Sequence, residues 1–237
     1  MAKTNGLGVR LYGGGYDLNA DVSALQGMGY TQQLLDVPSL EKSAMERLPG
    51  LADGKLTVNG WFDPASGHAV WTANSGKLPT ADVTVIAGLG TARGDAFAGL
   101  VAKQASYAVS RQPGNAIATV IEYMANGAAL EFGALLTDGP KQTDASATDS
   151  TGVDNAAATT NGGAGYLEII SLDSGTPTIK IQDSANNSAF SDIGSFTVNT
   201  AHSAERIAIA GTIRRYVRVS TTGTFSNLVI VAGIVRL

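Results

Sequence analysis

The stretch LLDVPSLEKSAMERLPGLADGKLTVNGWFDP, residues 34–64, decides how the first half of the chain is interpreted. It begins as a strand and ends as a clearer one, because residues 56–62 alternate apolar and polar side chains at a period of two. Between the strands lies a polar connection of about twenty residues, broken by Pro49, Gly50 and Gly54, which is too long for a tight hairpin. Loops of this length in a compact domain are usually functional or disordered. We therefore predict that this loop contacts another copy of the protein.

The charged side chains of this loop are predicted to pair across a subunit interface rather than to catalyse a reaction. The predicted interface residues are these charged side chains and one apolar residue next to them, Leu48. The charged ones are Glu41, Lys42, Glu46, Arg47 and Asp53. On this interpretation Glu46→Lys or Arg47→Glu blocks assembly but leaves the monomer folded.

Composition favours an assembled protein over an isolated one. The 237 residues suffice for one large or two small domains, and 44% of them are hydrophobic, so the chain is expected to fold. Only 15% are charged, against about 25% in typical soluble domains. A surface with so few charges is better tolerated when it is buried in an oligomer.

Charge and residue usage also argue against several functional classes. The net charge of −4 provides no basic surface for nucleic acid. Cysteine is absent, so we expect neither disulfides nor a thiolate metal site. The first fifteen residues lack the apolar core of a signal peptide, and the longest apolar runs are too short to cross a membrane.

The pattern along the chain is mainly β. Residues 7–30 are predicted to be extended, with a glycine bend at 13–15, and residues 66–74 form the best short helix, with Ser66 as its N-cap. Further strands are predicted at 82–87, 100–111, 116–124, 130–137, 166–172, 178–183, 190–198, 206–210, 216–220 and 228–235. Residues 138–164 contain four Asp, one Lys and a single sizeable apolar residue, which predicts a flexible linker.

The expected organisation is therefore three segments. Residues 1–137 form a first β domain, 138–164 a linker, and 165–237 a small Ig-like β-sandwich of short strands joined by Gly and Asn turns.

No catalytic, cofactor or metal constellation is predicted. The two histidines, His68 and His202, are not part of any metal-binding motif, and no nucleophile elbow is present. The segment 183–187 could be read as a calcium loop, but it lacks the spaced carboxylates and is explained as a turn. We expect a protein that is not an enzyme.

A basic strand near the C-terminus is the candidate ligand face. Arg214, Tyr216 and Arg218 are spaced by two and so share one side of a predicted strand, with Arg215, Val217 and Val219 on the other side. Such a face could bind a sugar, a phosphate or an acidic neighbour, or could simply pair with nearby carboxylates.

Part of the sequence resembles the tail tube (major tail) proteins of long-tailed, siphophage-type bacteriophages. The resemblance covers residues 7–137. Its motifs are Arg47-Leu48-Pro49-Gly50, Asp53-Gly54, the turn Trp61-Phe62-Asp63-Pro64 before a short helix, and residues 100–107 on the following strand.

This resemblance implies a fold, an assembly and a set of partners. The fold is a tail-tube-type β-sandwich or barrel with one short helix and a long inter-strand loop, and the small β-sandwich lies on the tube exterior. Subunits form hexameric rings that stack into a hollow tail tube, and phage DNA passes through it without specific binding. The implied partners are further copies of the chain and other tail proteins, namely the tape measure, tail terminator and distal tail proteins. The implied location is the virion, after assembly in the host bacterial cytoplasm.

Two other functions fit the same sequence. One is a different virion part, such as a head decoration or head–tail connector protein, which copy number per particle would distinguish from a tube subunit. The other is a carbohydrate-binding module that binds a host-surface glycan through the C-terminal domain.

Overall fold

The computed structural model describes residues 8–37, 43–63, 78–111, 114–138 and 141–237. Every regular element in these residues is a β-strand, which confirms a mainly β fold. The described residues contain no helix, and the helix expected at 66–74 lies outside them. The chain divides into two compact units: unit 1 is Met1–Asp21, Val83–Gly99 and Glu131–Leu237, and unit 2 is Val22–Asp82 and Leu100–Leu130.

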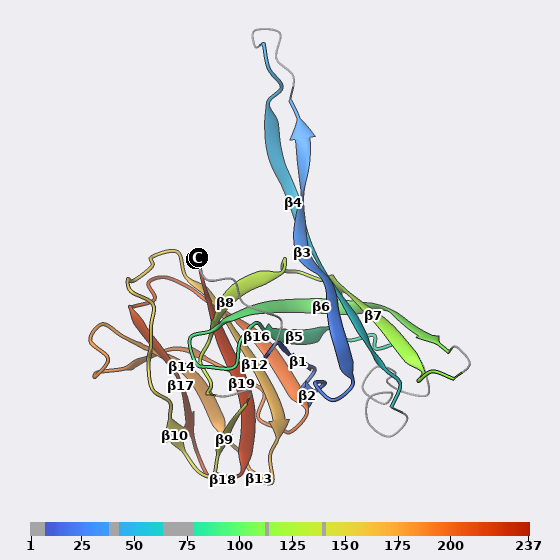
Figure 1. Ribbon diagram of the computed structural model, residues 1–237. Helices are drawn as coiled ribbons and strands as arrows, with labels where there is room; N and C mark the ends of the chain where they lie inside the picture. The colour runs from blue at the N-terminus through green and yellow to red at the C-terminus, as the bar shows by residue number, and fades with distance from the viewer. Residues whose placement is uncertain (1–7, 38–42, 64–77, 112–113, 139–140) are drawn as a thin grey trace. The chain divides into compact units, whose positions relative to one another are not determined.

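Unit 1 is built from two main antiparallel sheets and a further sheet of two short strands. The strands of unit 1 are β1 (Arg10–Gly13), β2 (Tyr16–Asp17), β5 (Val83–Gly88), β8 (Glu131–Leu135), β9 (Gln142–Asp144), β10 (Thr148–Asp149), β11 (Val153–Asp154), β12 (Gly163–Ser171), β13 (Ser174–Gly175), β14 (Thr178–Ser184), β15 (Ser191–Ser195), β16 (Ser203–Ile209), β17 (Tyr216–Thr222), β18 (Phe225–Ser226) and β19 (Leu228–Arg236). One sheet contains the order β16-β12-β19-β8, and the other has the order β10-β17-β14-β15 (Figure 1). One hydrophobic cluster takes residues from both sheets, including Leu167 and Ile230 from the first and Ile181 and Val219 from the second. These shared apolar residues make the two sheets a sandwich.

Residues 138–164 differ from the expected flexible linker. They contribute β9, which pairs with β19, and β10 and β11, which both pair with β17. Polar contacts replace the missing apolar ones, since the buried Asp144 accepts a 2.8 Å hydrogen bond from the Thr221 hydroxyl. Composition alone could not show this order, because it comes from pairing with strands far along the chain. The separate roles of 1–137 and 165–237 remain predictions.

Unit 2 is a sheet of four strands in the order β3-β4-β7-β6. They are β3 (Val22–Asp36), β4 (Arg47–Trp61), β7 (Ala118–Ala125) and β6 (Ala96–Ser110), whose first four residues belong to unit 1. Alternation along β4 buries Leu56 and Val58, and Ile121 and Tyr123 of β7 are buried in the same unit. This is the period of two on which the strand prediction for 56–62 rested.

The long loop predicted between residues 34 and 56 is wrong in its extent. β3 runs to Asp36 and β4 begins at Arg47, so most of the stretch is a hairpin of two fifteen-residue strands. The register includes Leu34 opposite Pro49 and Asp36 opposite Arg47. Pro49 is accommodated because this half of β4 pairs with β3 alone and leaves its other edge unpaired among the described strands.

Candidate functional site

The outer half of the β3–β4 hairpin is the feature most available for contact with another molecule. β4 pairs with β7 only over Lys55–Trp61, whereas residues 47–54 pair only with β3 (Figure 1). We call residues 30–37 and 43–54 the arm. In the described residues the arm is thus a two-stranded ribbon, and such ribbons are marginally stable in water unless something packs on them.

The arm carries a concentration of exposed apolar side chains. Fourteen large hydrophobic residues are exposed among those described, and seven lie in the arm. They are Tyr30, Leu34, Leu35, Val37, Met45, Leu48 and Leu51, the last with 84% of its surface exposed. Scattered exposed apolar residues are normal, but seven of them on one hairpin are typical of an interaction site.

The predicted interface residues are placed on the arm as far as the structure describes them. Arg47 Nε donates a 2.9 Å hydrogen bond to Asp36 Oδ1 across the hairpin, with both side chains about half exposed. Leu48 is exposed beside this pair, and Asp53 Oδ1 accepts the backbone N–H of Gly54. Glu46 is exposed, and its backbone carbonyl accepts from Val37. Glu41 and Lys42 lie outside the described residues.

One side of β3 is an open sheet edge. Within the part of the chain that the structure describes, β3 pairs with β4 and with no other strand. Its fifteen residues contain one charged side chain, Asp36. Natural sheets usually protect such edges with charges, prolines or a covering element. Sequence reasoning missed this edge, although the low charge of residues 22–35 was a usable signal.

A small hollow lies at the base of the arm. It has a volume of about 280 Å³ and is lined by Leu51, Ala52 and Asp53 of β4, by Ala125 and by residues 127–129. Small side chains form most of its wall, so it could accept one apolar side chain of a partner.

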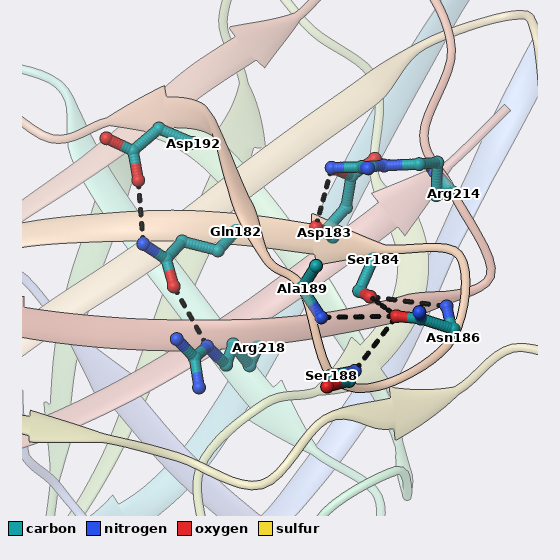
Figure 2. Close-up of polar contacts among 9 residues, drawn as sticks. All are labelled: Gln182, Asp183, Ser184, Asn186, Ser188, Ala189, Asp192, Arg214 and Arg218. Carbon is teal, nitrogen blue, oxygen red and sulfur yellow. Dashed lines mark hydrogen bonds and ion pairs between the residues drawn. The ribbon is translucent and has the colours of Figure 1, made fainter.

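The three residues of the predicted ligand face have different partners in the folded chain. Arg214 is committed to Asp183, a buried carboxylate that accepts hydrogen bonds from the Arg214 side chain and backbone (Figure 2). Tyr216 lies under the guanidinium of Arg215, whose carbon is 5.0 Å from the ring centroid. Arg218 points to a different set of partners, Gln182 and Asp149. Pairing with nearby carboxylates, the alternative given above, is therefore seen for both Arg214 and Arg218.

The turn at 183–187 is explained without calcium. Both carboxylate oxygens of Asp183 accept hydrogen bonds from Arg214, and Asn186 Oδ1 accepts from the backbone of Ser188 and Ala189 at 3.1 Å (Figure 2). No group of three or more residues that could hold a metal ion occurs among the described residues.

Charged pairs elsewhere in unit 1 are structural. Arg215 donates two hydrogen bonds to Asp154, and this pairing lowers the pKa of the Asp154 carboxyl to about 2. Arg206 binds Glu131 in the same two-pronged way, which raises the pKa of the arginine.

The glycine bend predicted at 13–15 is a turn that docks on a buried acid. Gly14 and Gly15 have positive φ, and the Gly15 N–H donates a 2.5 Å hydrogen bond to Glu168 of β12. Glu168 is fully buried, and burial raises its pKa well above the usual range, although the Gly15 bond acts the other way. His202 is exposed and stacks on Tyr16 at 4.2 Å between ring centroids, while His68 lies outside the described residues.

Among the described residues, no helix is long enough and apolar enough to cross a membrane.

Comparisons with known proteins give low structural similarity. No protein-family model matches the sequence, and no curated protein matches it. Among solved structures, a chain of the virion of a native gene transfer agent particle matches with 19% identity and a TM-score of 0.41, covering 55% of this chain and 98% of that one.

Two other solved structures have similar scores. The Dit protein of phage SPP1, described as part of a hub adsorption apparatus, has 11% identity and a TM-score of 0.39, with 95% of this chain and 98% of that one covered. A sheath/tube terminator of an extracellular contractile injection system has 12% identity and a TM-score of 0.42, covering 56% of this chain and 97% of that one. TM-scores this low carry no argument about the function of this chain.

Proposed function

We propose that this chain is a structural subunit of a phage tail tube. Copies form hexameric rings, and the rings stack into the hollow tube through which DNA leaves the particle. The ring size and the passage of DNA follow from the resemblance of residues 7–137 to tail tube proteins. The chain has no catalytic role in this proposal.

The observation that carries the proposal is the open edge of β3. An edge of fifteen residues with one charge would recruit unwanted strands if it stayed exposed. Pairing with a strand of the next subunit satisfies its backbone groups and removes the edge, as closure of a β-barrel does. Among the described strands, β3 is an end strand of the large sheet, whereas β6 at the other side of unit 2 also pairs with β5 and β8, so in a ring of subunits the β3 of one copy would pair with a strand of the next copy.

The arm supplies the second contact, between rings. Its apolar side chains are exposed in the isolated chain and would be covered by a neighbouring copy in the next ring. The hollow beside Leu51 and Asp53 offers a place for one such side chain. Burying even half of these seven side chains would contribute several kcal/mol per subunit, at about 1.5–3 kcal/mol for each fully buried one.

Immunogold labelling of virions together with quantitative mass spectrometry tests the proposal. A tube subunit is expected to label the tail along its length and to rank among the most abundant virion proteins. Labelling of the head, or a few copies per particle, would instead support a head decoration or connector protein.

A further inference from the structure

Unit 1 contains an open hollow that the tube proposal does not use and that shares one residue, Arg218, with the predicted ligand face. It has a volume of about 270 Å³ and is lined by residues 149–152, by Asn187 and Phe190, and by Arg218. Pockets for drug-sized ligands measure about 300–1,000 Å³, so this one suits a smaller ligand, about the size of one sugar ring.

The side chain of Arg218 is held in place before any ligand arrives. Its Nε donates a 2.8 Å hydrogen bond to Gln182 Oε1, and its Nη2 donates a 2.7 Å bond to Asp149 Oδ2. The guanidinium carbon lies 4.0 Å from the centroid of the Phe190 ring. Gln182 is itself fixed by a 2.7 Å bond from its amide to Asp192, as Figure 2 shows. A group fixed in this way loses little conformational entropy on binding.

The opposite wall is formed by a turn that is also fixed. Asn186 Oδ1 accepts three hydrogen bonds, from the Ser184 hydroxyl and from two backbone N–H groups, which close the turn (Figure 2). Asn187 follows with φ of 58°. A Cβ on Gly152 would lie 2.4 Å from Asn187 Oδ1 and 3.0 Å from the Phe190 ring, so the backbone of Gly152 lies close to both side chains.

The chemistry of the lining favours a neutral ligand with many hydroxyl groups. The charge of Arg218 is matched by Asp149, whose other oxygen accepts a bond from the Ser220 hydroxyl. An anion would be repelled by this carboxylate and a cation by the guanidinium. Thr151 and Asn187 add both donors and acceptors, and Phe190 adds an aromatic ring. We propose that this hollow binds a neutral sugar, with Arg218, Asp149 and Asn187 as hydrogen-bonding groups.

Saturation-transfer NMR on the full chain tests the site, with glucose, galactose, mannose and N-acetylglucosamine as probes. At least one is expected to receive transfer with a Kd near the millimolar range, which corresponds to about −4 kcal/mol. Arg218→Gln is expected to weaken it tenfold or more, and Thr151→Ala, on the exposed rim, at least threefold. Arg215→Gln is the matched control, since Arg215 also pairs with an aspartate and covers an aromatic ring but does not line the hollow.

Three results would overturn the proposal. The first is the absence of saturation transfer to all four sugars at a sugar concentration of ~20 mM, which is 20-fold the expected Kd. The second is unchanged sugar binding in both Arg218→Gln and Thr151→Ala. The third is preferential binding of the anionic sugar N-acetylneuraminic acid. This test is independent of the tail-tube proposal. A chain that assembles into tubes but binds no sugar would contradict the sugar proposal and leave the tail-tube proposal unaffected.

Discussion

At the scale of single residues, the charge of Arg47 could serve either the stability of the fold or the contact between copies, and its ion pair with Asp36 helps to decide between these two roles. It joins the strands of the arm across 2.9 Å, but both side chains are about half exposed. Exposed pairs of this kind contribute about 0–1 kcal/mol to stability. The importance of Arg47, if the interface prediction is correct, therefore lies in contacts with another copy rather than in folding.

Arg47→Glu tests this directly. We expect the variant to remain folded, with its unfolding free energy lowered by less than about 1 kcal/mol, and to lose assembly; Glu46→Lys is expected to behave alike. Circular dichroism and sedimentation velocity measure the two properties. The charge-swapped variant Asp36→Arg/Arg47→Glu restores the pair within the arm. If the swap, or Arg47→Glu alone, assembles like the unmodified chain, the residue is not an interface contact.

Glu168 gives the fold a dependence on pH. Its pKa in the folded chain lies well above the unfolded value, because it is buried and its Oε1 has no hydrogen-bond partner among the described residues. The folded chain thus holds a proton that the unfolded chain has lost. This group's stabilising contribution is complete below the unfolded pKa and is lost as the pH rises through the folded pKa.

We predict that Glu168→Gln flattens the pH dependence of stability. The unmodified chain should lose up to about 1.4 kcal/mol per pH unit from this group in the window above the unfolded pKa. Urea unfolding from pH 4 to 8 measures the slope, and the comparison of slopes is unaffected by any constant cost of the amide. Parallel curves for the two proteins would show that Glu168 does not titrate there.

At the scale of elements, sequence periodicity predicted strands wherever one face is buried. Residues 56–62 alternate, and the structure buries Leu56 and Val58 there. Residues 47–54 were missed because Leu48 and Leu51 are exposed, so no burial pattern marks that half of β4. Pro49 and Gly50 then favoured a loop by local propensity, whereas cross-strand pairing with β3 determines the structure.

The candidate site was predicted in part for the same reason. The stretch 34–64 drew attention to Arg47, Leu48 and Asp53, which the structure places on the arm. Of the residues that line the hollow in unit 1, the sequence singled out Arg218 alone, since no local pattern connects it with residues 149–152, Asn187 and Phe190.

The open edge of β3 leads to a prediction about the element itself. Gln26 and Tyr30 are exposed, so Gln26→Lys/Tyr30→Lys should leave the monomer folded while charging the edge. Charges on an edge strand oppose pairing with another strand. We expect light scattering to show that this variant does not assemble at concentrations where the unmodified chain does.

The control places the same two charges elsewhere, as Thr212→Lys/Ala145→Lys on exposed positions of unit 1. Assembly is expected to survive in this control. Assembly by both lysine variants would mean that the β3 edge is not used.

At the scale of the whole molecule, the boundary of the C-terminal sandwich is testable. The cluster between its sheets includes Leu136, which is fully buried, and Ala134 packs against it. A fragment of residues 165–237 lacks both and also lacks β8 to β11. We predict that it is less stable than a fragment of residues 131–237 by more than about 2 kcal/mol, the contribution of one buried leucine.

Chemical denaturation of the two fragments, monitored by far-UV circular dichroism, measures this difference in stability. Equal stability would show that the sandwich begins at residue 165, as the composition suggested, and that the strands of 138–164 add nothing to it.

The central claim is that β3 becomes an interior strand of a continuous wall when copies of this chain join. Cryo-electron microscopy of the assembled full-length chain, or of the virion tail, tests it most directly. We predict stacked rings in which the open edge of β3 pairs with a strand of the adjacent copy. A tube in which that edge still faces solvent, or a chain that stays monomeric at high concentration and is absent from the tail, would contradict the account.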